Sequence, residues 1–189
     1  MLNLYKLIEI LVSLLSLVIT TMLPVYIPLQ FINKSINSFE IPITWQIPTA
    51  ILLTLIFQKE VILKAFYIYI FLGLFIAPVF HQGGSIGYLL TPNFGYLLGL
   101  YPLIKIIDNF NKRNKINFGN FLINGFKAIC ALHLTGIFYN FIQIIFFSQF
   151  NIFLYNLGKY SVGKIGYHFI MLLPLLLLIK PIKHLKKSK

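Results

Sequence analysis

Two clusters of glycine, proline and hydrogen-bonding residues could form a ligand-binding site. The first lies in residues 81–99, HQGGSIGYLLTPNFGYLLG, where five glycines allow positive backbone torsions and close approach of a ligand. Pro92 and Asn93 indicate a turn or the start of a helix. Backbone N–H groups at a helix start can hold a carboxylate or ureido oxygen. Tyr88 and Tyr96 can supply an apolar wall and a hydroxyl group.

The second cluster consists of Pro42, Thr44, Trp45 and Gln46, at the start of an apolar run. The topology derived below places both clusters on the same face of a membrane, so they could line one cavity. The alternative is that the loop glycines are close-packing positions between helices. The residue pattern alone leaves both interpretations open.

A formal match to the hydrolase motif G-x-S-x-G lies at residues 83–87. A serine hydrolase needs this serine on a strained turn with a histidine base within reach, and His133 is the nominal partner of Ser85. We disfavour this chemistry because Ser85 follows an apolar run rather than a strand, and no acid is placed to orient His133. The pattern favours His133 as a packed residue that bonds to a neighbouring helix. His81 and His168 are too isolated to predict a metal site.

Two lysines could bind an anionic ligand. Lys164, at the start of the last apolar run, is well placed for an anion that arrives from outside. Lys127 lies within the fifth run, where a buried ammonium group would need an anion, unless the span begins later and this lysine lies at its rim. Glu9 and Lys6 are near a helix end and can extend to the membrane surface.

The composition predicts an integral membrane protein. Of 189 residues, 58% are hydrophobic and only 11% are charged, whereas soluble domains carry about 25% charged residues. The net charge is +12, but the aromatic residues lie inside apolar runs, so we expect no nucleic-acid partner. One cysteine, Cys130, excludes an intrachain disulfide. Scattered acids disfavour metal and acid–base chemistry, so no metal or cofactor is expected; they are Glu9, Glu40, Glu60 and Asp108.

Six apolar runs predict an all-α bundle of six transmembrane helices in a single domain, residues 1–189. The approximate spans are 4–29, 43–57, 61–80, 94–107, 118–147 and 165–182. With both termini on one side, twelve of the sixteen Lys and Arg residues lie on that side and three on the other. Because loops rich in Lys and Arg stay cytoplasmic, we expect both termini in the cytoplasm and the protein in the cell membrane.

Four segments between Ile41 and Gly99 resemble the BioY family, the biotin-binding S components of energy-coupling-factor (ECF) transporters. They are PITWQ from Pro42, YIFLGLFIAPVF from Tyr69, the pair Gly83-Gly84, and TPNFGYLLG from Thr91. Further on, HLTGIFY from His133 resembles the I-H-x-x-G-x-x-Y segment of cyanobacterial-type members.

This resemblance implies a six-helix S-component bundle that captures biotin in an outward-facing pocket. It also implies a transmembrane T component and two ATP-binding subunits as partners. The chain has no match to the ATP-binding motif G-x-x-x-x-G-K-[ST], so we do not expect it to be an enzyme. The predicted substrate-binding residues are Thr44, Gln46, Gly83, Gly84, Tyr88, Asn93, Gly95, Tyr96, Lys164 and Tyr167.

The chain departs from the family pattern near its end. Lys164 stands at a position that is acidic in many members, and Tyr167 stands where those members have a lysine. Three outcomes for vitamin binding stay open from these departures: rearranged contacts, weaker binding, or binding of a related molecule. In the first helix the small residues Ser13 and Ser16 are three apart rather than four, which alters the surface expected to dock the T component.

Two other functions remain open from the residues alone. One is a small membrane acyltransferase or hydrolase, although acyltransferases place glycine loops and cations on the cytoplasmic face, and the glycine loop here is expected outside. The other is a non-catalytic membrane scaffold, which the pattern of spans does not exclude.

Overall fold

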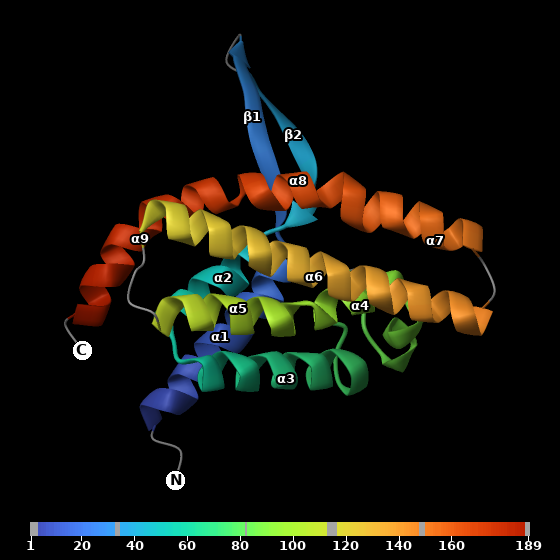
Figure 1. The fold of residues 1–189 in the computed structure, drawn as a ribbon, viewed down its shortest axis with the longest axis horizontal. Helices are drawn as coiled ribbons and strands as arrows, with labels where there is room; N and C mark the ends of the chain where they lie inside the picture. Colours follow the sequence, from blue (N-terminus) through green and yellow to red (C-terminus); the bar gives the residue numbers. More distant parts are fainter. Residues whose placement is uncertain (1–3, 33–34, 82, 113–116, 148–149, 188–189) are drawn as a thin grey trace.

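The computed structural model describes residues 4–32, 35–81, 83–112, 117–147 and 150–187, and it begins with a helix followed by a hairpin (Figure 1). Helix α1 (Leu4–Met22) ends earlier than the expected span 4–29. Strand β1 (Pro24–Ile32) follows and pairs antiparallel with β2 (Ser35–Thr44). The helix ends before residue 29 because Pro24 and Pro28 lack the N–H groups that a helix interior needs. The residues between these two prolines favour strands.

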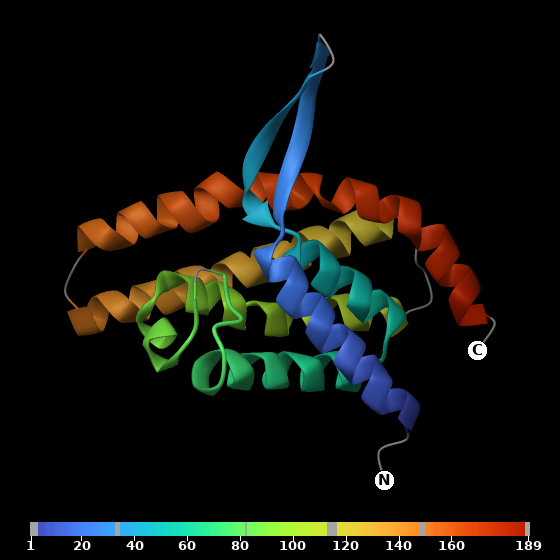
Figure 2. The same cartoon turned by 180° about the vertical axis from the view of Figure 1, so that it is seen from behind.

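The hairpin projects past helix α8 and away from the other helices (Figures 1 and 2). Its base is anchored by a small apolar cluster, in which Val25, Ile41 and Ile43 pack with Met171. The base of the hairpin therefore belongs to the packed body of the protein.

The middle of the chain forms four helices that are shorter than a membrane span. They are α2 (Gln46–Ile56), α3 (Lys59–Phe75), α4 (Pro92–Leu98) and α5 (Leu100–Lys112), with a 3₁₀ turn, η1 (Ile86–Leu90), before α4. The expected span 94–107 is divided at Gly99. A Cβ atom at Gly99 would lie 2.6 Å from the backbone oxygen of Leu132, so glycine is needed for close approach to α6.

The last part of the chain is a long helix followed by a second, segmented one. Helix α6 (Phe118–Phe147) matches the expected fifth span. The second consists of α7 (Phe150–Asn156), a π-helical turn η2 (Leu157–Val162), α8 (Gly163–Ile170) and α9 (Leu172–Lys187). This segmented helix therefore begins before the expected span 165–182. Its glycines and lysines interrupt the apolar pattern, but they do not interrupt the helix.

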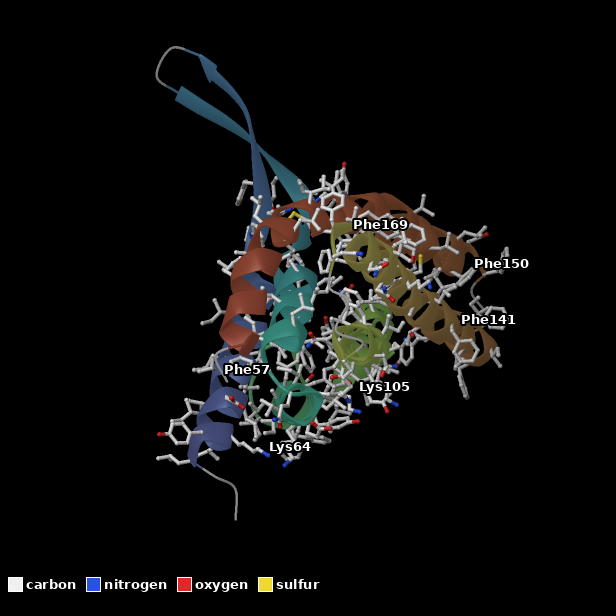
Figure 3. The ribbon with its side chains drawn as sticks, turned by 60° about the vertical axis from the view of Figure 1, so that its left-hand side comes forward. Phe57, Lys64, Lys105, Phe141, Phe150 and Phe169 are labelled. Carbon is white, nitrogen blue, oxygen red and sulfur yellow. The ribbon has the colours of Figure 1, made fainter. Side chains whose placement is uncertain are left out.

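Large apolar side chains cover much of the outer surface. Three helices are long and apolar enough to cross a membrane, within residues 4–22, 118–146 and 150–178. Among their exposed side chains are Phe141 and Phe150, which point outward (Figure 3). This surface suits lipid rather than water.

The centre of the bundle is helix α5, whose Leu103, Ile104 and Ile107 are completely buried between α3 and α6. The start of α3, the end of α5 and the end of α9 lie together at one end of the molecule (Figure 1). Lys64 and Lys105 lie on the side away from the hairpin (Figure 3). The candidate site lies instead beside the base of the hairpin.

Candidate ligand-binding cavity

A cavity of about 320 Å³ lies where the base of the hairpin meets α2, α3, α4 and α8. Its volume is in the range of small-molecule sites in proteins. The wall combines apolar side chains, among them Ile47, Phe80, Leu97 and Leu132, with several hydroxyl, amide, imidazole and ammonium groups. This cavity could recognise a ligand that has an apolar body and polar groups at defined positions.

Six of the ten predicted site residues line this cavity. They come from β2, α2, η1, α4 and α8, and they are Thr44, Gln46, Tyr88, Asn93, Tyr96 and Lys164. Residues of the two clusters singled out in the sequence therefore meet at one place, although 35 positions separate Gln46 from His81 in the chain.

The predicted pair Gly83 and Gly84 is not part of the lining and instead shapes the loop beside it. Gly83 has a φ of +140°, which favours glycine, and its backbone pairs with that of Phe80. A Cβ atom at Gly84 would lie 2.6 Å from the Cα of Pro78 and 2.8 Å from the carbonyl oxygen of Gly73. These two glycines therefore hold the loop against α3.

Gly95 and Tyr167 also lie outside the lining. Gly95 faces α6, where a Cβ atom would collide with the ring of Tyr139, so it is a helix-packing position. Tyr167 packs against the apolar cluster at the base of the hairpin. Both residues position elements that bear the lining without contributing to it.

A buried hydrogen-bonded chain supports Gln46. Its amide nitrogen donates to the hydroxyl of Tyr69 at 3.0 Å, and the Tyr69 hydroxyl donates to Oγ1 of Thr21 at 3.2 Å. Tyr69 is fully buried and belongs to α3, while Thr21 belongs to α1. Three helices thus fix the orientation of one cavity residue.

The loop between α3 and α4 is tied to the cavity by Tyr88. Its hydroxyl donates to the carbonyl of His81 at 3.0 Å, and burial raises the pKa of Tyr88. Burial also lowers the pKa of His81, and the charge of Lys164 lowers it further, so the imidazole of His81 is neutral at pH 7. His81 begins the first sequence cluster but was not among the predicted binding residues, because it has no partner close in the chain.

Two ammonium groups flank one aromatic ring in the wall. The Nζ atoms of Lys159 and Lys164 each lie 5.3 Å from the centre of the Tyr160 ring. Lys159 and Tyr160 belong to the π-helical turn η2, and such turns occur frequently at functional sites. Sequence reasoning missed Tyr160, because a π turn changes which side chains share a helix face.

A second polar chain connects α4, η2, α6 and α8. The Tyr96 hydroxyl and the Ser161 hydroxyl lie 2.7 Å apart, and Ser161 lies 3.3 Å from Nδ1 of His133. Nε2 of His133 lies 3.0 Å from Nδ1 of His168, which also lines the cavity. The prediction that His133 bonds to neighbouring helices is confirmed, and its two ring nitrogens are engaged with residues other than Ser85.

Replacing His133 with leucine should lower the melting temperature in detergent by about 2–4 °C. Hydrogen bonds between membrane helices contribute about 0.6 kcal/mol each on average, and His133 makes two such contacts. A loss of about 1 kcal/mol lowers the melting temperature by about 2–4 °C in a protein of this size. Thr135→Val is the matched control, because the Thr135 hydroxyl bonds to Ala131 within α6 itself. An equal shift in both variants would contradict a role for His133 in joining helices.

The BioY family model matches residues 3–173. The chain belongs to the BioY family. A search of curated proteins gave no match. Among solved structures, this BioY chain is similar to one described as "Crystal structure at 2.1 A of the S-component for biotin from an ECF-type ABC transporter". The two share 24% identity with a TM-score of 0.56, and the match covers 99% of this chain and 95% of the other.

The match to that solved structure shows a shared fold, that of an ECF S component. Every residue that lines the cavity of this BioY chain lies within the region matched by the family model. The family and the apolar helices identify a membrane transport protein. Among the residues that the structure describes, no group of three or more His, Cys, Asp or Glu side chains is placed to hold a metal ion.

Proposed function

We propose that this BioY protein captures biotin from the outer side of the cell membrane, as the S component of an ECF transporter. The observation that carries the proposal is the cavity, which gathers residues of the two sequence clusters around a space suited to a small molecule; they are Thr44, Gln46, Tyr88, Asn93 and Tyr96. Family membership and the similar fold of a biotin S component support it.

In this proposal the ligand carboxylate binds at Lys164. The ammonium group is half-buried in the cavity wall, and within the described chain no carboxylate lies within ion-pairing distance of it. An ammonium group removed from water gains most from an anionic partner. Gly83, Gly84, Gly95 and Tyr167 act indirectly, by holding the loop, α4 and the base of the hairpin in place.

The energy for uptake comes from partner proteins. The chain carries no ATP-binding motif of the G-x-x-x-x-G-K-[ST] type, so a T component and two ATP-binding subunits drive release to the inside. We place both termini in the cytoplasm. This orientation is supported by the common location of the start of α3 and the ends of α5 and α9 (Figure 1), because these segments carry many of the lysines.

Purified protein in detergent should bind labelled biotin saturably, and an excess of unlabelled biotin should displace it. Binding to the folded state alone should also raise the melting temperature. Heat-unfolded protein is the control for label taken up by the micelle. Absence of both saturable binding and thermal stabilisation at micromolar biotin would refute the assignment.

A further inference from the structure

The cavity contains charges of both signs, and they come from different elements. Glu40 on β2 is the acidic residue in its wall, and Lys159 and Lys164 on η2 and α8 are the basic ones. In the described part of the chain, the ion pair formed within 4 Å joins Lys112 and Asp108, at the far end of α5. Glu40 and Lys164 thus face one cavity without neutralising each other.

The Glu40 carboxylate is held by the strand opposite. Tyr26 is its direct cross-strand partner, and the Tyr26 hydroxyl donates to Oε2 of Glu40 at 3.3 Å. The proximity of the carboxylate raises the pKa of the Tyr26 hydroxyl, so this hydroxyl stays protonated and able to donate. A carboxylate can accept about four hydrogen bonds, so this contact leaves most of its capacity for a ligand.

The strand that carries Glu40 is also fixed relative to the helix that carries Lys164. Ile41 and Ile43, which follow Glu40 on β2, pack in one apolar cluster with Tyr167 on α8 and with Met171 directly after it. The carboxylate and the ammonium group are therefore carried by elements that pack together, and both line the same cavity.

Biotin has complementary chemistry at its two ends. Its valerate tail ends in a carboxylate, and its ureido ring presents two N–H donors. A carboxylate beside Glu40 would be repelled, whereas the N–H donors would find an acceptor there. At Lys164 the preference is opposite, because an ammonium group donates hydrogen bonds and accepts none.

We propose that Glu40 accepts hydrogen bonds from the ureido N–H groups of biotin while Lys164 binds its carboxylate, so that the ligand spans the cavity from β2 to α8. This inference rests on the proposed function and goes beyond it, because it assigns an orientation and a recognition residue on the hairpin. It also specifies the ligand class: a molecule with a carboxylate at one end and clustered N–H donors at the other.

The test uses 2-iminobiotin, in which a guanidinium group, positively charged at neutral pH, replaces the ureido group. Both ligands are titrated against the parent chain, Glu40→Gln, Glu40→Asp and Glu60→Gln. Glu60 is a matched control, since it is exposed on α3 and does not line the cavity. Melting temperatures of all four proteins establish that each is folded, and competition with labelled biotin extends the range of measurable affinities.

We expect Glu40→Gln to weaken 2-iminobiotin at least tenfold more than biotin. Glu40→Asp should retain most of the preference of the parent chain, and Glu60→Gln should retain all of it. An unchanged ratio of the two affinities in Glu40→Gln would overturn the orientation, as would a change in this ratio that follows substitution of Lys164 instead. If the parent chain bound neither ligand, the proposed function itself would fail.

Discussion

Replacing Lys164 with methionine should weaken biotin binding by roughly 30- to 150-fold. Methionine keeps an unbranched side chain of similar length but removes the charge, so the ligand carboxylate loses its partner inside the cavity. Removing one member of a desolvated charge pair costs about 2–3 kcal/mol or more, and each 1.4 kcal/mol is a factor of ten in affinity. Isothermal titration in detergent measures the difference directly.

Lys127→Met is the matched control for this substitution. Lys127 is exposed on α6 and does not line the cavity, so its loss should leave the affinity for biotin unchanged. A second control is biotin amide, which has no charge on its tail and should bind parent and Lys164→Met with similar affinity. An equal loss for biotin and its amide would contradict a carboxylate contact at Lys164.

Replacing Gly84 with alanine should abolish high-affinity binding and lower the melting temperature by several degrees. The added Cβ atom would lie 2.6 Å from the Cα of Pro78 and 2.8 Å from the carbonyl oxygen of Gly73. Both of these neighbours are backbone atoms, so the loop itself must move. Movement of this loop displaces Phe80, which packs edge-on against Tyr69 with ring centres 5.2 Å apart and lines the cavity. Overpacking of this kind typically costs about 1–3 kcal/mol.

Gly87→Ala provides the comparison for Gly84 within the same loop. A Cβ atom at Gly87 would lie 3.6 Å from the Ser85 hydroxyl oxygen, which is an ordinary contact distance, and its φ lies outside the positive range. This substitution should leave both binding and melting temperature within error of the parent. If Gly84→Ala were equally well tolerated, the proposed role of Gly84 in holding the loop would be wrong.

The sequence predicted the long apolar helices better than the elements that lie between them. Helix α6 carries an unbroken apolar pattern and has the expected bounds. The hairpin was read as part of a span, because Val25, Tyr26 and Ile27 are as apolar as a membrane helix, and hydropathy alone does not separate the two. The start of the last helix was missed for the opposite reason, since Gly158 and Lys159 interrupt the apolar pattern without interrupting the helix.

The predicted site residues that the structure brings together lie in short segments of recognisable sequence, and their role in binding stays a prediction. Thr44, Gln46 and Tyr96 lie in short segments whose order could be recognised, and each lines the cavity. Glu40 and Tyr160 could not be identified in this way. The position of Glu40 depends on which face of β2 meets α8, and the position of Tyr160 depends on the register of the π turn η2. Both are properties of packing between distant segments.

The length of helix α2 has a consequence for where the cavity lies in the membrane. Its eleven residues extend about 16 Å, roughly half of the 30 Å hydrocarbon layer. Gln46, the first residue of α2, lines the cavity. The last turn of α2 lies toward the end of the molecule where α3 starts and where α5 and α9 end (Figure 1). In the proposed orientation, a ligand bound beside Gln46 lies about one length of α2 from the cytoplasmic end of the molecule, which corresponds to a position near the membrane midplane.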